Sequence, residues 1–232
     1  MIERRQFDGL SGADHGWLKA KHHFSFASYY NPARMGWGSI LVWNDDEIAA
    51  NSGFPPHPHD NMEIITYVRK GAITHQDSVG NKGRTEAGDV QVMSAGGGIR
   101  HAEYNLEPHT TKIFQIWIEP TRRGGNPAWA TRPFPRGDRS GQFVTLASGS
   151  PDDAGALPIR SEARVLGASI AAGETVEYTL AAGRHAYLVP AKGVVEVNGM
   201  RVDARDGAAI KDETHLKVTA LADAEIILVD AP

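Results

Sequence analysis

The chain has 232 residues, of which 41% are hydrophobic and 22% are charged, and its formal net charge is −4. This length allows one large or two small domains, and the slight negative charge argues against direct nucleic-acid binding. No apolar run reaches the roughly 20 residues of a membrane helix, and the first residues lack the apolar centre of a signal peptide. We therefore expect a cytoplasmic protein that does not interact with membranes.

The sequence contains no cysteine and ten histidines. Disulfides and thiolate metal sites are excluded, which agrees with an intracellular location. Any metal in this protein must be held by imidazole and carboxylate groups.

The first forty residues are irregular, and residues 21–32 form an aromatic segment that includes His22 and His23. Aromatic rings dominate core burial. We therefore interpret this segment as packing its rings against a sheet, with both histidines hydrogen-bonded or solvated.

Short strands follow, separated by Gly, Pro and Asn. In the first half they are expected over residues 39–43, 63–68, 72–76, 90–93 and 112–118. Because 63–68 and 72–76 are separated only by a Lys-Gly turn, they predict a hairpin. No segment has a convincing helical period, and many short strands with Gly and Pro between them predict an all-β sandwich or barrel.

Residues 120–141 are rich in Pro, Gly and Arg, and this change in composition marks the best linker in the chain. We interpret its five arginines as a solvated connector in preference to an anion-binding patch. The predicted organisation is an N-terminal metal-binding domain over residues 1–125, a linker over 126–141 and a C-terminal domain over 142–232.

The second half is again built of strands, and Asn198-Gly199 between two alternating runs is a strong hairpin signal. Both halves share the order of a Lys-Gly turn followed by a Gly-containing turn and a further strand, which is typical of two copies of one β-barrel. The second copy holds only His185 and His215, far apart and unpaired. Only the first barrel is therefore expected to bind metal.

Two pairs of metal-capable side chains carry the functional prediction. His57 and His59 are two residues apart, and so are His101 and Glu103. On a strand this spacing places both side chains on one face. Three imidazoles and one carboxylate suit Fe(II), Mn(II), Ni(II), Co(II) or Cu(II), and they leave positions open for other ligands.

Glu63 leaves an alternative open. It lies four residues after His59, so on a continuous strand it shares the face of that histidine. It can replace Glu103 as a ligand, or it can orient a histidine by hydrogen bonding without touching the ion.

Three further polar residues lie near the two pairs. We interpret His75 as an ordinary strand histidine, and Asn61 and Asn105 as turn residues.

The sequence resembles the cupins and, more narrowly, the pirins. The cupin-like motifs are Gly53-Phe54-Pro55-Pro56-His57-Pro58-His59 with Asn61-Met62-Glu63 and Gly71, and Gly88-Asp89 through Gly96, His101 and Asn105. The pirin-like motifs are His22-His23-Phe24-Ser25-Phe26, Tyr29-Tyr30-Asn31-Pro32, Phe54-Pro55-Pro56-His57-Pro58-His59 and Gly98-Ile99-Arg100-His101-Ala102-Glu103. The segment Pro127-Ala128-Trp129-Ala130 departs from the pirin pattern, in which Tyr-Gln follows the proline, and the second half matches only as a degenerate barrel.

This resemblance implies a bicupin, that is, two tandem jelly-roll β-barrels, with an iron-type metal, Fe(II) first, in the N-terminal one. It implies that His57, His59, His101 and Glu103 bind the metal and that Glu63 only orients a ligand. It also implies the activity of bacterial pirins, quercetin 2,3-dioxygenase, which opens the central ring of a flavonol with O2 and releases carbon monoxide.

The residues suit this chemistry. A metal lowers the pKa of a bound hydroxyl, and Glu103 can accept the proton of the flavonol 3-hydroxyl as a general base. The alternative is a redox-sensitive metal-containing regulatory protein that acts through a protein partner. A metal-dependent isomerase or small-molecule sensor is a third function that the same scaffold can host.

Overall fold

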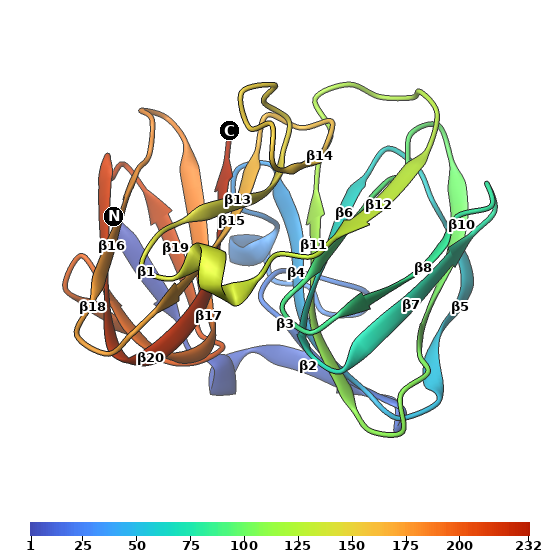
Figure 1. The fold of residues 1–232 in the computed structure, drawn as a ribbon, viewed down its shortest axis with the longest axis horizontal. Coiled ribbons are helices and arrows are strands. Elements are labelled where there is room, and N and C mark those ends of the chain that lie inside the picture. The colour runs from blue at the N-terminus through green and yellow to red at the C-terminus, as the bar shows by residue number, and fades with distance from the viewer.

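The computed structural model describes the backbone of residues 1–232 and every side chain except that of Arg136. Within this described part the fold is all-β, with three sheets and only short 3-10 helices. Figure 1 shows two barrels side by side, with the N-terminal strand (blue) among the strands of the C-terminal barrel (orange and red). None of the described helices has the length and apolar character needed to cross a membrane.

The first barrel contains strands β2 to β12. They are β2 (Ser11–Asp14), β3 (Leu18–His22), β4 (Ile40–Ile48), β5 (Ser52–His59), β6 (Glu63–Lys70), β7 (Ala72–Asp77), β8 (Lys82–Glu86), β9 (Val90–Ser94), β10 (Ile99–Asn105), β11 (Thr111–Ile118) and β12 (Ala128–Arg132). The 3-10 helices are η1 (Phe7–Gly9), η2 (Pro32–Arg34) and η3 (Arg136–Arg139).

The second barrel contains β1 and strands β13 to β20. They are β1 (Ile2–Arg5), β13 (Val144–Ser148), β14 (Leu157–Pro158), β15 (Arg164–Ile170), β16 (Thr175–Thr179), β17 (His185–Val197), β18 (Met200–Val202), β19 (Gly207–Lys211) and β20 (His215–Ala231).

In the first barrel a seven-stranded sheet, ordered β12-β9-β6-β11-β4-β3-β2, is combined with a four-stranded sheet, ordered β5-β10-β7-β8. Strand β5 holds three prolines, and it lies at the edge of its sheet, where residues without an N–H are tolerated. The predicted hairpin between 63–68 and 72–76 is wrong. Gly71 between β6 and β7 has φ = 78°, and the chain passes there from the seven-stranded to the four-stranded sheet.

The second barrel is a nine-stranded sheet. The predicted hairpin at Asn198-Gly199 is confirmed, because Val197 pairs with Met200 and the two turn residues have φ values of 46° and 88°. Positive φ at both central positions is the signature of a type I′ turn. The inner positions of this barrel form an apolar cluster that includes Leu166, Leu188 and Leu228.

The expected domain limits need two corrections. Strand β1, placed by sequence in the first domain, pairs antiparallel with β19 of the second barrel. Strand β12, placed in the linker, pairs with β9 of the first barrel. Edge positions accept short strands from distant parts of the chain, and local sequence does not reveal such pairing. We propose that residues 142–232 together with 2–5 form the second barrel.

The two barrels are joined by a shared apolar core. Trp43, Phe114 and Tyr67 from the first barrel belong to the same buried cluster as Tyr187 and Val229 from the second.

The connector between the barrels is not wholly solvated. The side chain of Arg139 is fully buried, and its Nη2 donates to the Gly88 carbonyl at 2.9 Å. The interpretation of a solvated arginine-rich connector is therefore wrong for this residue, although Arg122, Arg123 and Arg132 are exposed.

Candidate metal centre

Three of the predicted ligands meet where β5 lies beside β10. His57 on β5 is paired directly with His101 on β10, and their Nε2 atoms are 3.0 Å apart. The ring of His59 lies 4.8 Å from that of His57 and 5.0 Å from that of His101, between centroids. One ring nitrogen from each histidine lies within 4.8 Å of the other two. The alternation of side chains along β5 and the pairing of β5 with β10 therefore bring the three imidazoles together.

The backbone fixes the orientation of His57. Its Nδ1 lies 2.8 Å from the carbonyl oxygen of Pro55, which can only accept a hydrogen bond, so Nδ1 carries the proton. The Nε2 lone pair then points at His101. Two nitrogens bound about 2.1 Å from one ion at a right angle would lie about 3 Å apart, which matches the 3.0 Å separation of the two Nε2 atoms.

Burial keeps two of these histidines neutral. It lowers the pKa of His59 to about 4 and that of His101 to about 3, with smaller contributions from neighbouring imidazoles. Neutral imidazole is the form that offers a lone pair to a metal. The rings of His59 and His101 can therefore bind a cation at neutral pH.

Glu103 follows His101 on β10 and is 1% exposed. Its Oε1 accepts from Gln91 Nε2 at 2.6 Å and from Thr66 Oγ1 at 3.2 Å, and its Oε2 accepts from Gln115 Nε2 at 2.7 Å. A carboxylate has about four acceptor positions, so these three bonds leave one for a cation. A Glu103 oxygen lies within 4.8 Å of nitrogens of His101 and His75, in a second group that shares His101 with the first.

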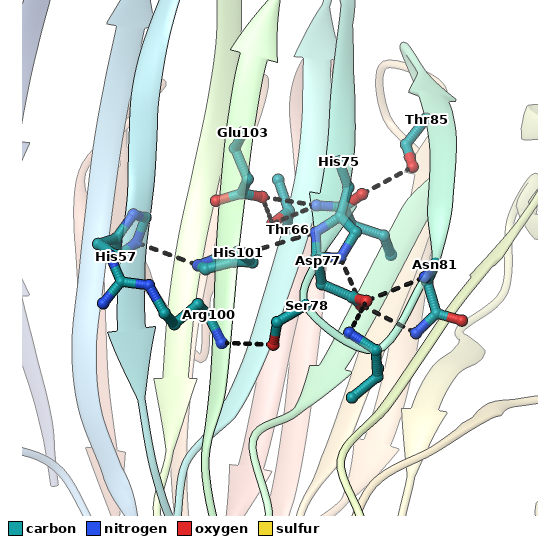
Figure 2. Close-up of polar contacts among 12 residues, drawn as sticks. His57, Thr66, His75, Asp77, Ser78, Asn81, Thr85, Arg100, His101 and Glu103 are labelled. Carbon is teal, nitrogen blue, oxygen red and sulfur yellow. Dashed lines mark hydrogen bonds and ion pairs between the residues drawn. The ribbon is translucent and has the colours of Figure 1, made fainter.

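His75 is a functional candidate that sequence reasoning set aside. It is 0% exposed and its ring stacks on Trp129 at 4.9 Å and 9°. Its Nδ1 lies 3.4 Å from Nδ1 of His101, and its Nε2 lies 3.0 Å from Oδ2 of Asp77. Figure 2 shows His57, His101, His75 and Asp77 in a row across the barrel wall.

This row assigns a proton to each ring. The Asp77 carboxylate accepts from His75 Nε2–H, so His75 Nδ1 accepts from His101 Nδ1–H, and His101 Nε2 remains free for a metal. Although burial of Asp77 opposes it, hydrogen bonds from His75 and Asn81 lower the pKa of this carboxyl. A carboxylate that orients a histidine ligand is a common support of metal sites. The spacing of His75 and Asp77, two residues apart, was the available sequence signal.

Glu63 does not lie with the histidines. Its Oε2 accepts from the hydroxyl of Ser94 and, at 3.1 Å, from the backbone N–H of Arg160 in the second half of the chain. The expectation that Glu63 orients a metal ligand fails because β5 and β6 are not one strand. Asn61, with φ = 47°, turns the chain between them, and the two strands belong to different sheets.

The turn assignment of Asn61 agrees with the structure, whereas Asn105 is the last residue of β10, pairs with Ser52 and is buried. Asn61 Oδ1 accepts from the Gly124 N–H at 2.7 Å, and Asn105 Nδ2 donates to the carbonyls of Ile48 and Ala49.

A cavity of about 810 Å³ opens beside the three histidines. His57, His59 and Glu103 are part of its wall, together with the rings of Phe26, Tyr29, Tyr30, Phe54 and Trp117. The aromatic segment 21–32 therefore contributes three rings to this wall, which its interpretation as a segment packed against a sheet did not include.

Other residues of this segment serve the fold. Phe24 is buried in the core between the barrels, His22 Nδ1 lies 2.9 Å from Asn44 Oδ1, and His23 Nδ1 lies 2.9 Å from the Tyr187 hydroxyl. The interpretation of hydrogen-bonded histidines is confirmed.

These donors fit a divalent first-row metal. Three imidazole nitrogens and one carboxylate oxygen are hard to borderline ligands. Because His57, His59 and Glu103 line the cavity, further positions on an ion held there can accept a substrate.

Comparisons with known proteins agree with this geometry. The family model described as Pirin matches residues 3–118, and the model described as quercetinase C-terminal cupin domain matches residues 145–231. A pirin-like protein of Caulobacter vibrioides is 73% identical over 231 residues, covering 100% of both chains. Quercetin 2,3-dioxygenase of Escherichia coli K12 is 40% identical over 100% of this chain and 99% of its own.

The fold has solved counterparts. The crystal structure of the bacterial pirin YhhW from Escherichia coli in complex with nickel(II) superposes with a TM-score of 0.93 at 39% identity. The match covers 100% of this chain and 99% of that one.

Proposed function

The chain belongs to the pirin family, and from this premise we propose that it is a metal-dependent dioxygenase. Its substrates are O2 and a flavonol such as quercetin, whose central ring is cleaved with release of carbon monoxide. The relatives named quercetin 2,3-dioxygenase support this assignment. The carrying observation is the cluster of His57, His59 and His101, of which His57 and His59 line the wall of an aromatic-lined cavity.

We propose that His57, His59, His101 and Glu103 hold one divalent transition metal. The nickel(II) complex of the related Escherichia coli pirin supports a divalent ion, and Fe(II) remains our first choice among Fe(II), Mn(II), Co(II), Ni(II) and Cu(II). When bound, such an ion supplies a Lewis acid that lowers the pKa of a coordinated hydroxyl.

The protein residues divide the remaining work. Trp117, Phe54 and Phe26 offer flat apolar surfaces for an aromatic substrate. Glu103 accepts the proton of the flavonol 3-hydroxyl at its fourth acceptor position when the carboxylate is briefly detached from the ion, while Gln91 and Gln115 hold it in place. Loss of this proton makes the central ring electron-rich, and the apolar wall limits water and side reactions.

The decisive test is turnover, with loss of the flavonol and release of carbon monoxide measured together. Protein reconstituted under nitrogen with each of the five metals in turn is mixed with air and quercetin, and flavonol absorbance and carbon monoxide are recorded together. Absorbance loss with stoichiometric carbon monoxide, absent in His101→Ala, supports the dioxygenase. His215→Ala, which removes an exposed histidine of the second barrel, is the control and keeps full activity.

Tight metal binding without turnover in any metal form would contradict the proposal. It would favour the alternative of a redox-sensitive regulatory protein, for which capture of a protein partner that depends on the oxidation state of the metal is the corresponding test.

A further inference from the structure

The wall of the cavity contains a carboxyl group that the proposed reaction does not use. Asp46 on β4 lines the cavity and is 3% exposed. Its backbone neighbours across the sheet are Ala20 on β3 and Ile113 on β11, which offer no polar side chain. Among the side chains that the structure describes, none forms a hydrogen bond with Asp46 Oδ1.

The adjacent residue on the same strand, Asp45, is a carboxylate with a structural role. Asp45 points to the other face of β4, where its carboxylate accepts from Arg69 and, at 2.6 Å, from Arg205 Nε. A buried carboxyl without a partner opposes folding. Asp45 therefore has a clear role in the fold, whereas Asp46 has none.

Burial, together with the smaller effect of the nearby charges of Asp45 and Glu103, raises the pKa of Asp46 to about 8, although Arg69 opposes the shift. At neutral pH this group is mainly the uncharged acid, which can donate one hydrogen bond and accept others.

Strand register places Asp46 relative to the metal-binding end of the cavity. Asn44 on β4 is paired with Gln115 on β11, and Gln115 Nε2 donates to Glu103 Oε2 at 2.7 Å. Asp46 lies two residues further along β4, which is about 7 Å in strand geometry. A ligand held near Glu103 would therefore extend past Asn44 toward Asp46. The Asn44 side chain is already engaged by His22.

We propose that Asp46 binds a phenolic hydroxyl of the aromatic substrate at the end remote from the metal-binding histidines. This inference rests on the proposed function of the cavity and adds a selectivity for polyhydroxylated over unsubstituted aromatic ligands. Water that enters the cavity can serve the same group in the free protein, and a substrate hydroxyl replaces it.

The experiment compares quercetin with 3-hydroxyflavone, which keeps the 3-hydroxyl and 4-carbonyl but lacks all other hydroxyls. Dissociation constants are measured under nitrogen on nickel-loaded protein by quenching of tryptophan fluorescence, since Trp117 lines the cavity. Wild type, Asp46→Asn, Asp46→Leu and the control Asp45→Asn are compared, and the melting temperature of each is recorded.

We expect wild type to prefer quercetin by about tenfold, the size of one buried hydrogen bond. Asp46→Leu should reduce this preference to within roughly twofold without lowering the melting temperature, because no fold contact is lost. Asp46→Asn should keep part of the preference. Asp45→Asn should keep all of it while lowering the melting temperature.

Equal preference in wild type and Asp46→Leu would overturn the inference, and so would a large drop in melting temperature in both Asp46 variants. These outcomes are independent of turnover. A protein that cleaves no flavonol but loses its quercetin preference in Asp46→Leu would refute the dioxygenase and support the hydroxyl site. Normal turnover of quercetin together with an unchanged quercetin preference in Asp46→Leu would support the dioxygenase and refute the hydroxyl site.

Discussion

The row Asp77–His75–His101 predicts that His75 contributes measurably to metal affinity without having to touch the metal. We consider His75→Phe, in which the new ring keeps the stacking position on Trp129. The substitution removes the acceptor of His101 Nδ1–H. The tautomer of His101 that binds metal has its proton on Nδ1 and its Nε2 lone pair directed at His57. In the variant this Nδ1–H is a buried donor without an acceptor, so His101 loses its preference for the metal-binding tautomer.

The magnitude follows from two considerations. An unpaired buried donor costs about 1–3 kcal/mol, which corresponds to roughly tenfold to hundredfold in affinity, and loss of a group that orients a ligand has a similar effect. The 3.4 Å separation of the two Nδ1 atoms is long for a hydrogen bond. We therefore expect the lower part of this range, about tenfold weaker metal binding.

The assay is calorimetric titration of apo-protein with Ni(II) under nitrogen, accompanied by a urea unfolding curve for each variant. His215→Phe introduces the same change at an exposed site of the second barrel and should bind like wild type. Asp77→Asn keeps an acceptor for His75 but removes its charge, so a smaller loss is expected. A folded His75→Phe protein with wild-type affinity would refute the role assigned to this row.

Three further predictions concern other parts of the molecule. Glu103→Gln should lower kcat for quercetin at least about 100-fold if this carboxylate is the general base, and a variant that loses metal yet keeps its turnover rate would contradict that role. Asp45→Asn should destabilise the protein by about 3 kcal/mol in urea unfolding, because the partly buried cations Arg69 and Arg205 lose a shared, fully buried partner; an unchanged midpoint would show that the pairs are not stabilising. Burial, reinforced by nearby arginines, lowers the pKa of His23 in the folded protein to about 3. In the unfolded chain the pKa of this histidine is about 6.5, so between these two values the unfolded chain binds a proton at His23 and the folded protein does not. Stability should therefore fall by about 2 kcal/mol from this residue between pH 7 and pH 5, and His23→Phe should show a correspondingly flatter dependence when unfolding is measured at both values.

The two pairs of candidate metal ligands were predictable because the position of each pair depends only on strand periodicity. His57 and His59, and likewise His101 and Glu103, are two residues apart, and side chains at this spacing share a face in any strand. The structure keeps the three histidines together even though the pairing of β10 with β5 shifts register between His101 and Glu103. A local bulge changes the partner opposite each residue, but it leaves the neighbouring imidazoles within reach.

The missed features depend on contacts between distant segments. Glu63 and the Lys70-Gly71 turn were misjudged because each lies where the chain leaves one sheet for the other, and a sequence pattern does not state which sheet a strand joins. Strand β1 was misplaced for the same reason. His75 was underestimated because its importance comes from its cross-strand position opposite Glu103 and from the stacking of Trp129, which arrives from a segment taken for a linker.

The contrast between the two barrels assigns the second a role in stability. The interior of the first barrel contains polar side chains such as Glu103, Gln115 and Asp46, and groups of this kind oppose burial unless they find partners. The second barrel has an apolar interior and shares a continuous apolar core with the first. It also contributes specific hydrogen bonds, such as the one that the Arg160 N–H donates to Glu63 and the one between the Tyr187 hydroxyl and His23. We infer that burial in the second barrel and its interface offsets the cost of a polar, ligand-binding interior in the first.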